Sequence, residues 1–175
     1  MALSDIQVKP MQVFWNSANL GSTSGGVEVA VEVQSTDIVT DQDGTAPVDA
    51  YQTGTSLTIS MTLMELNAAN YNAMIGDATG GNYTPSSGTE VSGYGSSRDF
   101  GSMLALCQEL KLKPVGASDD TTNWTFFKAI PIVESLSFAS DAAKTMSISF
   151  RVFKDSTKQA AISYGCYGDA TQNLT

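Results

Sequence analysis

The chain contains no histidine, and it has only two cysteines among its 175 residues. Without histidine, a Ser-His-Asp or Cys-His catalytic site cannot form within one chain, and zinc sites that use histidine are excluded. Cys107 and Cys166 are far apart in the sequence and show neither metal-type nor redox-type spacing. Two cysteines are also too few for a disulfide scaffold, so we expect a protein of a reducing compartment whose thiols act as small buried hydrophobes.

Long apolar runs are missing as well. No apolar stretch reaches the ~18 residues that a membrane-spanning helix needs, and the start MALSDIQVKP lacks the basic and apolar blocks of a secretory signal. We therefore expect no membrane insertion by this chain. Charged residues make up only 15% of the chain, whereas glycine occurs 15 times, a balance that favours strands and turns over helices. The length predicts a single domain over residues 1–175.

Basic residues are almost absent from the first part of the chain. Residues 1–97 contain ten acidic side chains and a single base, Lys9, whereas residues 98–175 contain eight of each sign. The whole net charge of −9 therefore belongs to the N-terminal part. Such a surface repels phosphate backbones, and the basic footprint of a nucleic-acid-binding protein is missing.

Two runs of alternating apolar and polar residues dominate what is present. Residues 26–36 read GVEVAVEVQST, and residues 55–66 read TSLTISMTLMEL. Alternation with a period of two predicts strands that have one dry and one wet face, and we expect the two runs to pair as a long hairpin. The expected dry face holds Val27, Val29, Val31, Val33, Leu57, Ile59, Met61 and Leu63, and the expected wet face holds Glu28, Ala30, Glu32, Gln34, Ser56, Thr58, Ser60 and Thr62.

The two runs are joined by a long acidic segment, DIVTDQDGTAPVDA, at residues 37–50. It contains four aspartates, a glycine and a proline, and it has no base. This composition predicts a loop that extends from the hairpin, although two or three residues are enough to connect two strands.

Further strands are expected along the rest of the chain. Pro131 interrupts one of them and implies an edge or a bulge at that point, because proline cannot donate a hydrogen bond to a sheet ladder. The expected strands cover residues 11–15, 124–139, 145–153 and 159–165. In the strand over 145–153, the alternation predicts that four side chains face inward: Met146, Ile148, Phe150 and Val152.

Helices are expected in only two short stretches. Residues 67–76 predict a helix that Asn67 caps at its start and Gly76 at its end. Residues 102–114 begin as a helix or turn and lead into a strand that ends at Pro114. We expect a turn over 19–26, a Gly/Ser-rich loop over 77–99 and a loose C-terminal tail over 156–175. The fold class that follows is mostly β: an antiparallel sandwich or partly closed barrel of about eight strands with one or two short helices.

No motif for catalysis or cofactor binding emerges from the sequence. There is no phosphate-binding G-x-x-x-x-G-K-[ST] sequence. The DQDG stretch fails as an EF-hand, because Val39 and Ala50 occupy the loop positions that require acids; a looser calcium site remains open, built from Asp37, Asp41, Asp43 and Asp49. Glu28 and Glu32 lie roughly 13 Å apart along a strand, which is too far for the carboxylate pair of a retaining glycosidase. We therefore expect a protein that is not an enzyme and needs no cofactor.

The order of these segments resembles that of the tail tube (major tail) proteins of long-tailed bacteriophages. A short strand precedes the Leu20-Gly21 turn, and a G-G-V-E-V strand, the D-Q-D-G-T-A-P-V-D segment and the T-G-T-S-L-T-I-S-M-T strand follow. The later stretch ALCQELKLKPVGASDDTTNWTFFKAIPI, with its K-A-I-P run ending at Pro131, and the final strand TMSISFRVFKD also fit this family. The resemblance covers most of residues 5–155, whereas the Gly-rich segment 77–99 and the tail after 156 match no part of the family pattern.

This resemblance implies a structural protein of the virion tail. Members of the family form hexameric rings that stack into a hollow tube, with strands of all subunits joined edge to edge into one inner barrel, and the type VI secretion tube protein shares the fold. Double-stranded DNA passes through the tube without specific binding. The implied partners are further copies of the chain and other tail proteins, and the implied locations are the host cytoplasm before assembly and the virion tail afterwards.

On this basis we expect the wet face of the hairpin to line the lumen, where acidic side chains keep passing DNA from sticking. The alternative is an ordinary solvated sheet face. The expected lumen-facing residues are Glu28, Glu32, Gln34, Thr58, Ser60 and Thr62.

The acidic segment 37–50 is expected to reach a neighbouring ring, where its apolar residues dock and its aspartates pair with bases such as Arg98, Lys111 or Lys113. Deleting residues 40–47 should then leave a folded chain that does not polymerise, whereas a merely flexible hairpin tip is the alternative. The expected inter-ring residues are Asp37, Ile38, Val39, Asp41, Asp43, Pro47, Val48 and Asp49.

Two other classes of function remain open at this level. A head decoration or tail-terminator ring would give discrete oligomers and never filaments. A secreted β-sandwich that binds sugars or mediates adhesion would favour a secretion signal and a cluster of exposed aromatic side chains.

Overall fold

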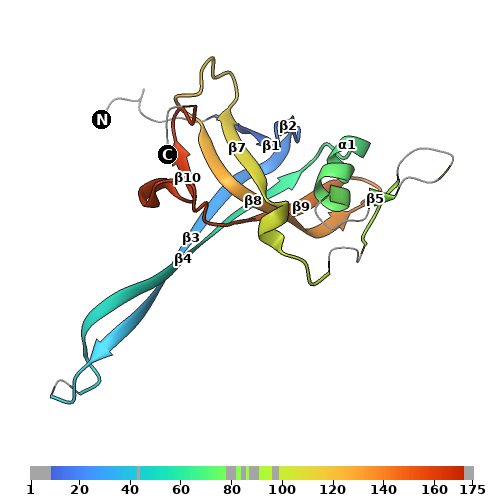
Figure 1. Ribbon diagram of the computed structural model, residues 1–175. Helices are drawn as coiled ribbons and strands as arrows, with labels where there is room; N and C mark the ends of the chain where they lie inside the picture. Colours follow the sequence, from blue (N-terminus) through green and yellow to red (C-terminus); the bar gives the residue numbers. More distant parts are fainter. Residues whose placement is uncertain are drawn as a thin grey trace.

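One antiparallel sheet dominates the computed structural model, which describes residues 9–42, 44–77, 82–83, 86, 91–95 and 99–171 (Figure 1). Its strand order is β2-β1-β7-β8-β9-β4-β3, with β10 added beside β8. The sheet is not closed, although β1 and β3 approach each other. The strands are β1 (Met11–Trp15), β2 (Ala18–Asn19), β3 (Thr23–Val39), β4 (Pro47–Leu63), β7 (Gln108–Pro114), β8 (Trp124–Ser137), β9 (Thr145–Val152) and β10 (Gly165–Tyr167). The expected mostly β, antiparallel fold is confirmed.

Short elements complete the described part of the chain. Helix α1 (Ala68–Tyr71) continues as a π-helical segment, η2 (Asn72–Asp77), and two 3₁₀ turns follow later, η3 (Met103–Leu106) and η4 (Ala160–Ile162). Strands β5 (Asn82–Tyr83) and β6 (Val91–Ser92) form a separate pair inside the stretch expected to be a Gly/Ser-rich loop, much of which lies outside the described residues.

The hydrophobic core lies inside the curve of the sheet. Alternate residues of β4 and β9 are buried there, and the four residues expected to face inward from β9 are all at most 5% exposed. Val13 and Trp15 from β1 and Leu110 and Leu112 from β7 pack against them, and Met74 and Ile75 of η2 belong to the same cluster. The period-two alternation of these strands therefore predicts the buried side correctly.

The expected helix start is confirmed and its end is shifted. The Asn67 side chain accepts a hydrogen bond of 2.9 Å from the backbone N–H of Asn70, as a helix N-cap does. Asn70 is itself buried and donates from Nδ2 to the Leu20 carbonyl at 2.9 Å. The helical segment runs through Asp77, one residue past Gly76.

Two expectations about the N-terminal and C-terminal parts are wrong. The turn expected over 19–26 ends early, because β3 begins at Thr23 and accommodates Gly25 and Gly26 as a bulge in which both have positive φ. The strand expected over 159–165 is a 3₁₀ turn, and the strand there begins only at Gly165. A Cβ at Gly165 would lie 2.4 Å from the Thr125 carbonyl, so only glycine permits this close approach of β10 to β8.

The segment after residue 156 is held against the sheet up to Thr171 and is not a loose tail there. The Asp155 N–H donates to the Ser163 carbonyl, and the Phe127 N–H donates to the Tyr164 carbonyl. The Tyr164 hydroxyl also donates to the Thr55 carbonyl at 3.0 Å, at the place where β4 leaves the body of the protein. This C-terminal segment therefore supports the base of the long hairpin.

Candidate assembly interface

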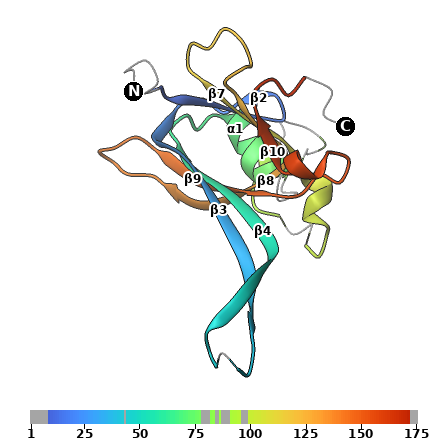
Figure 2. The same ribbon diagram turned by 90° about the vertical axis from the view of Figure 1, so that its left-hand side faces the viewer.

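The β3–β4 hairpin projects far beyond the body of the protein (Figures 1 and 2). Its strands are 17 residues each, so the loop between them spans only residues 40–46. The expectation of a loop over 37–50 is thus wrong: Asp37 pairs with Ala50 and Ile38 with Asp49. The Val, Ile and Thr residues that flank the aspartates favour extended backbone, and Pro47 is tolerated as the first residue of its strand.

The cross-strand register confirms which residues share a face of the hairpin. Glu28 lies opposite Ser60 and Glu32 opposite Ser56, whereas Val29 lies opposite Ile59. Because directly opposite residues point to the same side of a sheet, the six residues expected to line a lumen all lie on one face. The Ser56 hydroxyl donates to Glu32 Oε2 at 3.3 Å, which is one of the contacts that order this face.

The polar face widens across the neighbouring strands of the sheet. In the ladder between β4 and β9, Ser60 is paired with Ser149 and Thr62 with Ser147. The hydroxyl oxygens of Thr62 and Ser147 lie 3.5 Å apart. A hollow of about 390 Å³ opens on this side and is lined by Glu28 and by Glu134 of β8, among others. The face thus carries hydroxyls and carboxylates over four adjacent strands, β3, β4, β9 and β8.

The opposite, apolar face of the hairpin is only partly covered. Val29, Val31 and Val33 are 41%, 57% and 60% exposed, whereas Ile59 on the neighbouring strand is fully buried. The expectation of a dry face is therefore wrong for these three valines in the single chain. The reason is topological: β3 is the last strand of the sheet, and its outer half extends past the elements that cover β4.

Two long strand edges carry no partner strand among the described residues. One is the outer edge of β3, whose partner in the described sheet is β4 alone. The other is Pro131–Ser137 of β8, which pairs with β9 on one side, whereas the ladder with β7 on the other side stops at Ala129. The expected edge at Pro131 is confirmed. An apolar groove of about 290 Å³ runs along this β8 edge, and it is lined by Tyr94, Met103, Leu106 and the stretch 130–133. No local sequence pattern predicts this groove, because its walls come from segments far apart in the chain.

The far end of the hairpin exposes the residues expected to contact another ring. Ile38 is 37% exposed, Val39 55% and Val48 52%, and Asp37, Asp41, Pro47 and Asp49 are exposed as well. Asp43 lies outside the described residues, as does Arg98. Among the residues that the structure describes, no group of three or more carboxylate or thiol side chains is placed to hold a metal ion.

The two lysines suggested as docking partners lie on β7. Lys113 Nζ forms an ion pair with Asp120 Oδ1 at 3.4 Å. Lys111 and Lys113 line a cavity of about 240 Å³ together with Phe14, Ser17, Glu109 and Asp120. Their positive charge is therefore partly matched within the same chain.

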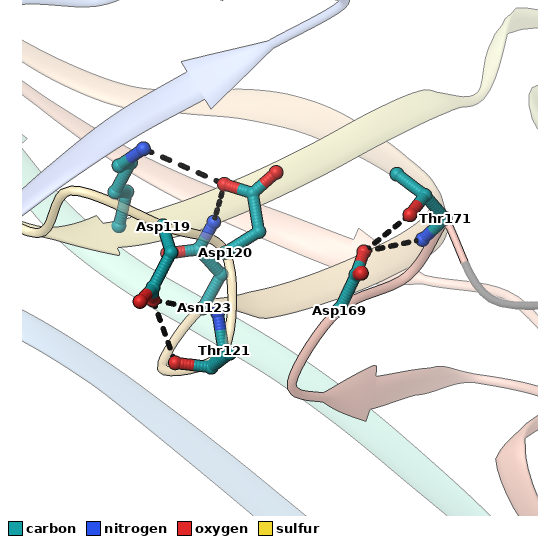
Figure 3. A network of polar contacts seen from close by, with 7 residues as sticks. Asp119, Asp120, Thr121, Asn123, Asp169 and Thr171 are labelled. Carbon is teal, nitrogen blue, oxygen red and sulfur yellow. Dashed lines mark hydrogen bonds and ion pairs between the residues drawn. The ribbon is translucent and has the colours of Figure 1, made fainter.

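Three Asp-x-Thr turns hold the loops around β8 and β10. In each, one Asp oxygen accepts from both the backbone N–H and the hydroxyl of the Thr two residues later: Asp119 with Thr121, Asp155 with Thr157 and Asp169 with Thr171. Figure 3 shows two of these turns, together with Asp120 and Asn123. The Thr121 hydroxyl and N–H lower the pKa of Asp119, and the Thr157 N–H lowers the pKa of Asp155.

The two thiols are half-buried and separate. The Cys107 thiol donates to the Met103 carbonyl at 3.3 Å, and burial raises the pKa of both Cys107 and Cys166. Neither thiol is thereby activated as a nucleophile.

No helix in the described ranges is long and apolar enough to cross a bilayer. Neither a comparison with models of protein families nor a search of curated proteins found a match to this chain.

Proposed function

We propose that this chain is a structural protein of a bacteriophage tail, whose copies form hexameric rings that stack into the hollow tube through which DNA passes. The observation that carries the proposal is the β3–β4 hairpin, with its unpaired edge, its exposed valine row and its polar opposite face. The ring size of six and the location in the virion are taken from the resemblance between the order of segments in this chain and that in the tail tube proteins. Before assembly the chain would reside in the host cytoplasm.

The two free edges support lateral assembly. An exposed strand edge is a template for pairing with another chain, and an edge groove with apolar walls accepts such a strand by β-augmentation. In a ring, β3 of one copy would pair along Pro131–Ser137 of the next copy. Such a head-to-tail contact uses two different surfaces and closes when the rotation between copies divides a full turn.

The two faces of the hairpin match the faces of this neighbouring edge. Val133 and Leu136 of β8 pack against the core, so a paired β3 would bring its valines to the same apolar side. Burying the half-exposed Val29, Val31 and Val33 would contribute on the order of 1 kcal/mol each. On the other side, Glu28 and Glu32 would lie beside Glu134 and Ser135, so the polar face would continue into the next copy with the exposed Ile132 as an apolar interruption.

A polar, acidic wall suits a bore that DNA must traverse. DNA carries one negative charge per ~1.7 Å of axis, so a basic wall would retain it. Salt limits the repulsion by carboxylates to about 8 Å, so the wall acts only at close range and does not block entry. Other tail proteins would cap the tube at its ends, and no catalytic or cofactor role is included in the proposal.

Cryo-electron microscopy of the purified chain over a range of concentrations tests the proposal. We expect rings and tubes in which Glu28 and Glu32 line the inner wall. A chain that stays monomeric at every concentration, or tubes with these glutamates on the outer wall, would contradict it. Discrete rings that never stack would favour the decoration or terminator class instead.

A further inference from the structure

The sequence of β3 is palindromic around Ala30. Residues 27–33 read VEVAVEV, so the side chains follow in the same order in both directions. When two copies of such a strand pair in antiparallel orientation, each residue can lie opposite a residue of its own type. The stretch belongs to the projecting hairpin (Figure 1), and the outer edge of β3 carries no partner strand among the described residues. Because an open edge is a template for pairing, a second copy of β3 competes with the β8 edge as its partner.

The valines of the palindrome favour this self-pairing. The ladder of β3 with β4 is regular from Val27 to Gln34 and is bounded by a register shift at each end. A two-fold pairing centred on Ala30 sets all four valines of the stretch opposite valines of the second copy. Valine favours sheets because it packs well against cross-strand neighbours. The valine row by itself would therefore stabilise a dimer of two β3 strands.

The same register sets glutamate against glutamate. Glu28 of each copy would lie opposite Glu32 of the other copy, so one dimer would contain two such pairs. Side chains directly opposite in an antiparallel pair have their Cβ atoms about 4.5–5.5 Å apart, and like charges there are destabilising. Moving the centre to Val29 or Val31 leaves the carboxylates in diagonal positions, but one valine of each copy then lacks a valine partner.

No positive charge of the hairpin relieves this repulsion, because residues 23–63 contain neither lysine nor arginine. Arg151 belongs to the same face, but it lies on β9, opposite Thr58 of β4 and two strands away from β3. The Ser56 hydroxyl donates to Glu32 at 3.3 Å and leaves its charge in place. Within the described residues, neither glutamate of the palindrome forms an ion pair.

We propose that Glu28 and Glu32 select the partner of β3: they exclude a second copy of β3 and leave the β8 edge of a neighbouring copy. The stretch Pro131–Ser137 carries a single carboxylate, Glu134, which lies at a register shift of its ladder with β9. Pairing with β8 therefore opposes fewer like charges than self-pairing does. The exclusion of self-pairing follows from β3 alone, whereas the choice of the β8 edge rests on the proposed function.

Removing the two charges tests the exclusion. The double variant Glu28→Gln with Glu32→Gln should form dimers whose Kd is lower than that of the wild type by about tenfold or more, because glutamine keeps the shape without the repulsion. Sedimentation velocity below the concentration at which the wild type assembles measures it. Glu134→Gln is the matched control, because it removes a carboxylate from the polar face but not from β3, and it should not promote dimers. A double variant that self-associates no more than the wild type would overturn the inference.

A disulfide at the two-fold axis identifies the register. In the proposed pairing, position 30 lies opposite its own copy, at a Cα spacing that a disulfide accepts. Ala30→Cys in the double glutamine variant should therefore cross-link two chains through position 30 under mild oxidation, as mapped by mass spectrometry. Gln34→Cys is the control and should not link to itself, because position 34 lies far along the strand from its own copy. Equal cross-linking through position 30 with the glutamates present, or a dimer without this cross-link, would overturn the inference.

A charge exchange separates this inference from the proposed function. A chain with Glu28→Lys and Glu32→Lys should form heterodimers when it is mixed with the wild type, because each lysine would lie opposite a glutamate, whereas neither chain should dimerise alone. If the wild type forms neither rings nor tubes but the mixture forms heterodimers, the proposed function fails and the role of the glutamates stands. If rings and tubes form but the mixture gives no heterodimers, the role of the glutamates fails.

Discussion

Asp155 is the residue that ties the C-terminal segment to the sheet. It is buried, its Oδ1 accepts from the Thr157 N–H at 3.0 Å and from the Thr157 hydroxyl at 2.8 Å, and Lys128 Nζ lies 3.7 Å away. The Thr157 N–H, followed by the Thr157 hydroxyl and the charges of Lys128 and Lys158, holds the pKa of Asp155 below its ordinary value of 3.8. The ionised carboxylate therefore stabilises the folded chain.

We expect Asp155→Asn to lower the free energy of unfolding by about 1–2 kcal/mol at pH 7, because a hydrogen bond to a charged group contributes about 1.5–3 kcal/mol and the amide keeps part of it. The folded pKa is lowered, so this stabilisation is complete above the unfolded pKa near 4 and is lost as the pH falls through the folded value. Urea unfolding of dilute protein, followed by tryptophan fluorescence at several pH values, measures it.

Asp119→Asn is the matched control, because Asp119 makes the same turn in an exposed loop and, within the described residues, has no ion pair like that of Asp155 with Lys128. Its effect at pH 7 should be smaller than that of Asp155→Asn. A difference between wild type and Asp155→Asn that is equally large at pH 3 and pH 7 would contradict the role assigned to the ionised carboxylate.

At the scale of elements, β3 carries valines on one face and polar or small side chains on the other. Val31 and Ala30 are adjacent, both exposed, and on opposite faces of the same strand. In the single chain both side chains are exposed, so burial alone does not indicate which face would contact another copy. The two faces differ in the proposed contact, because the valines would meet the apolar side of the β8 edge, where Val133 and Leu136 lie.

Val31→Lys should therefore abolish ring formation, while Ala30→Lys should allow it, because a lysine on the polar face stays in water. Both substitutions should change the stability of the monomer by no more than about 0.5 kcal/mol, as is usual for exposed sites. Analytical ultracentrifugation and thermal unfolding measure the two effects. Equal assembly by both variants would argue against burial of the valine face.

At the scale of the whole molecule, the distal part of the hairpin, residues 36–51, contributes no residue to the core. Every described residue of 36–51 is exposed except the half-buried Thr40. The core cluster contains no residue from this stretch, and Tyr164 supports the hairpin at Thr55, nearer the body. We therefore expect the body of the protein to fold without this distal part.

We expect a chain in which Asn-Gly replaces residues 36–51 to fold normally, because Ser35 and Gln52 are cross-strand neighbours and Asn-Gly makes a tight hairpin turn. Its melting temperature should stay within about 4 °C of the wild type, which corresponds to less than about 1 kcal/mol. Electron microscopy should show rings without tubes. If this variant forms tubes of normal length, residues 36–51 are not needed for the stacking of rings.

The sequence by itself determined the local features whose cause is local. Alternation places Glu28 and Val29 on opposite faces whatever surrounds the strand, and Asn67 can cap a helix with its own side chain. The inward residues of β9 and the edge at Pro131 follow in the same way, from side-chain period and a missing N–H.

The tertiary structure alone decided which face of each strand is covered and where the chain leaves an edge open. Whether Val31 is buried depends on what packs over β3, and that follows from the position of β3 at the end of the sheet. The extent of the hairpin strands is likewise set by cross-strand pairing, which overrode the loop-forming composition of residues 37–50. The groove beside β8 and the pair of Trp124 and Tyr167 join residues distant in the chain, so no local pattern could reveal them.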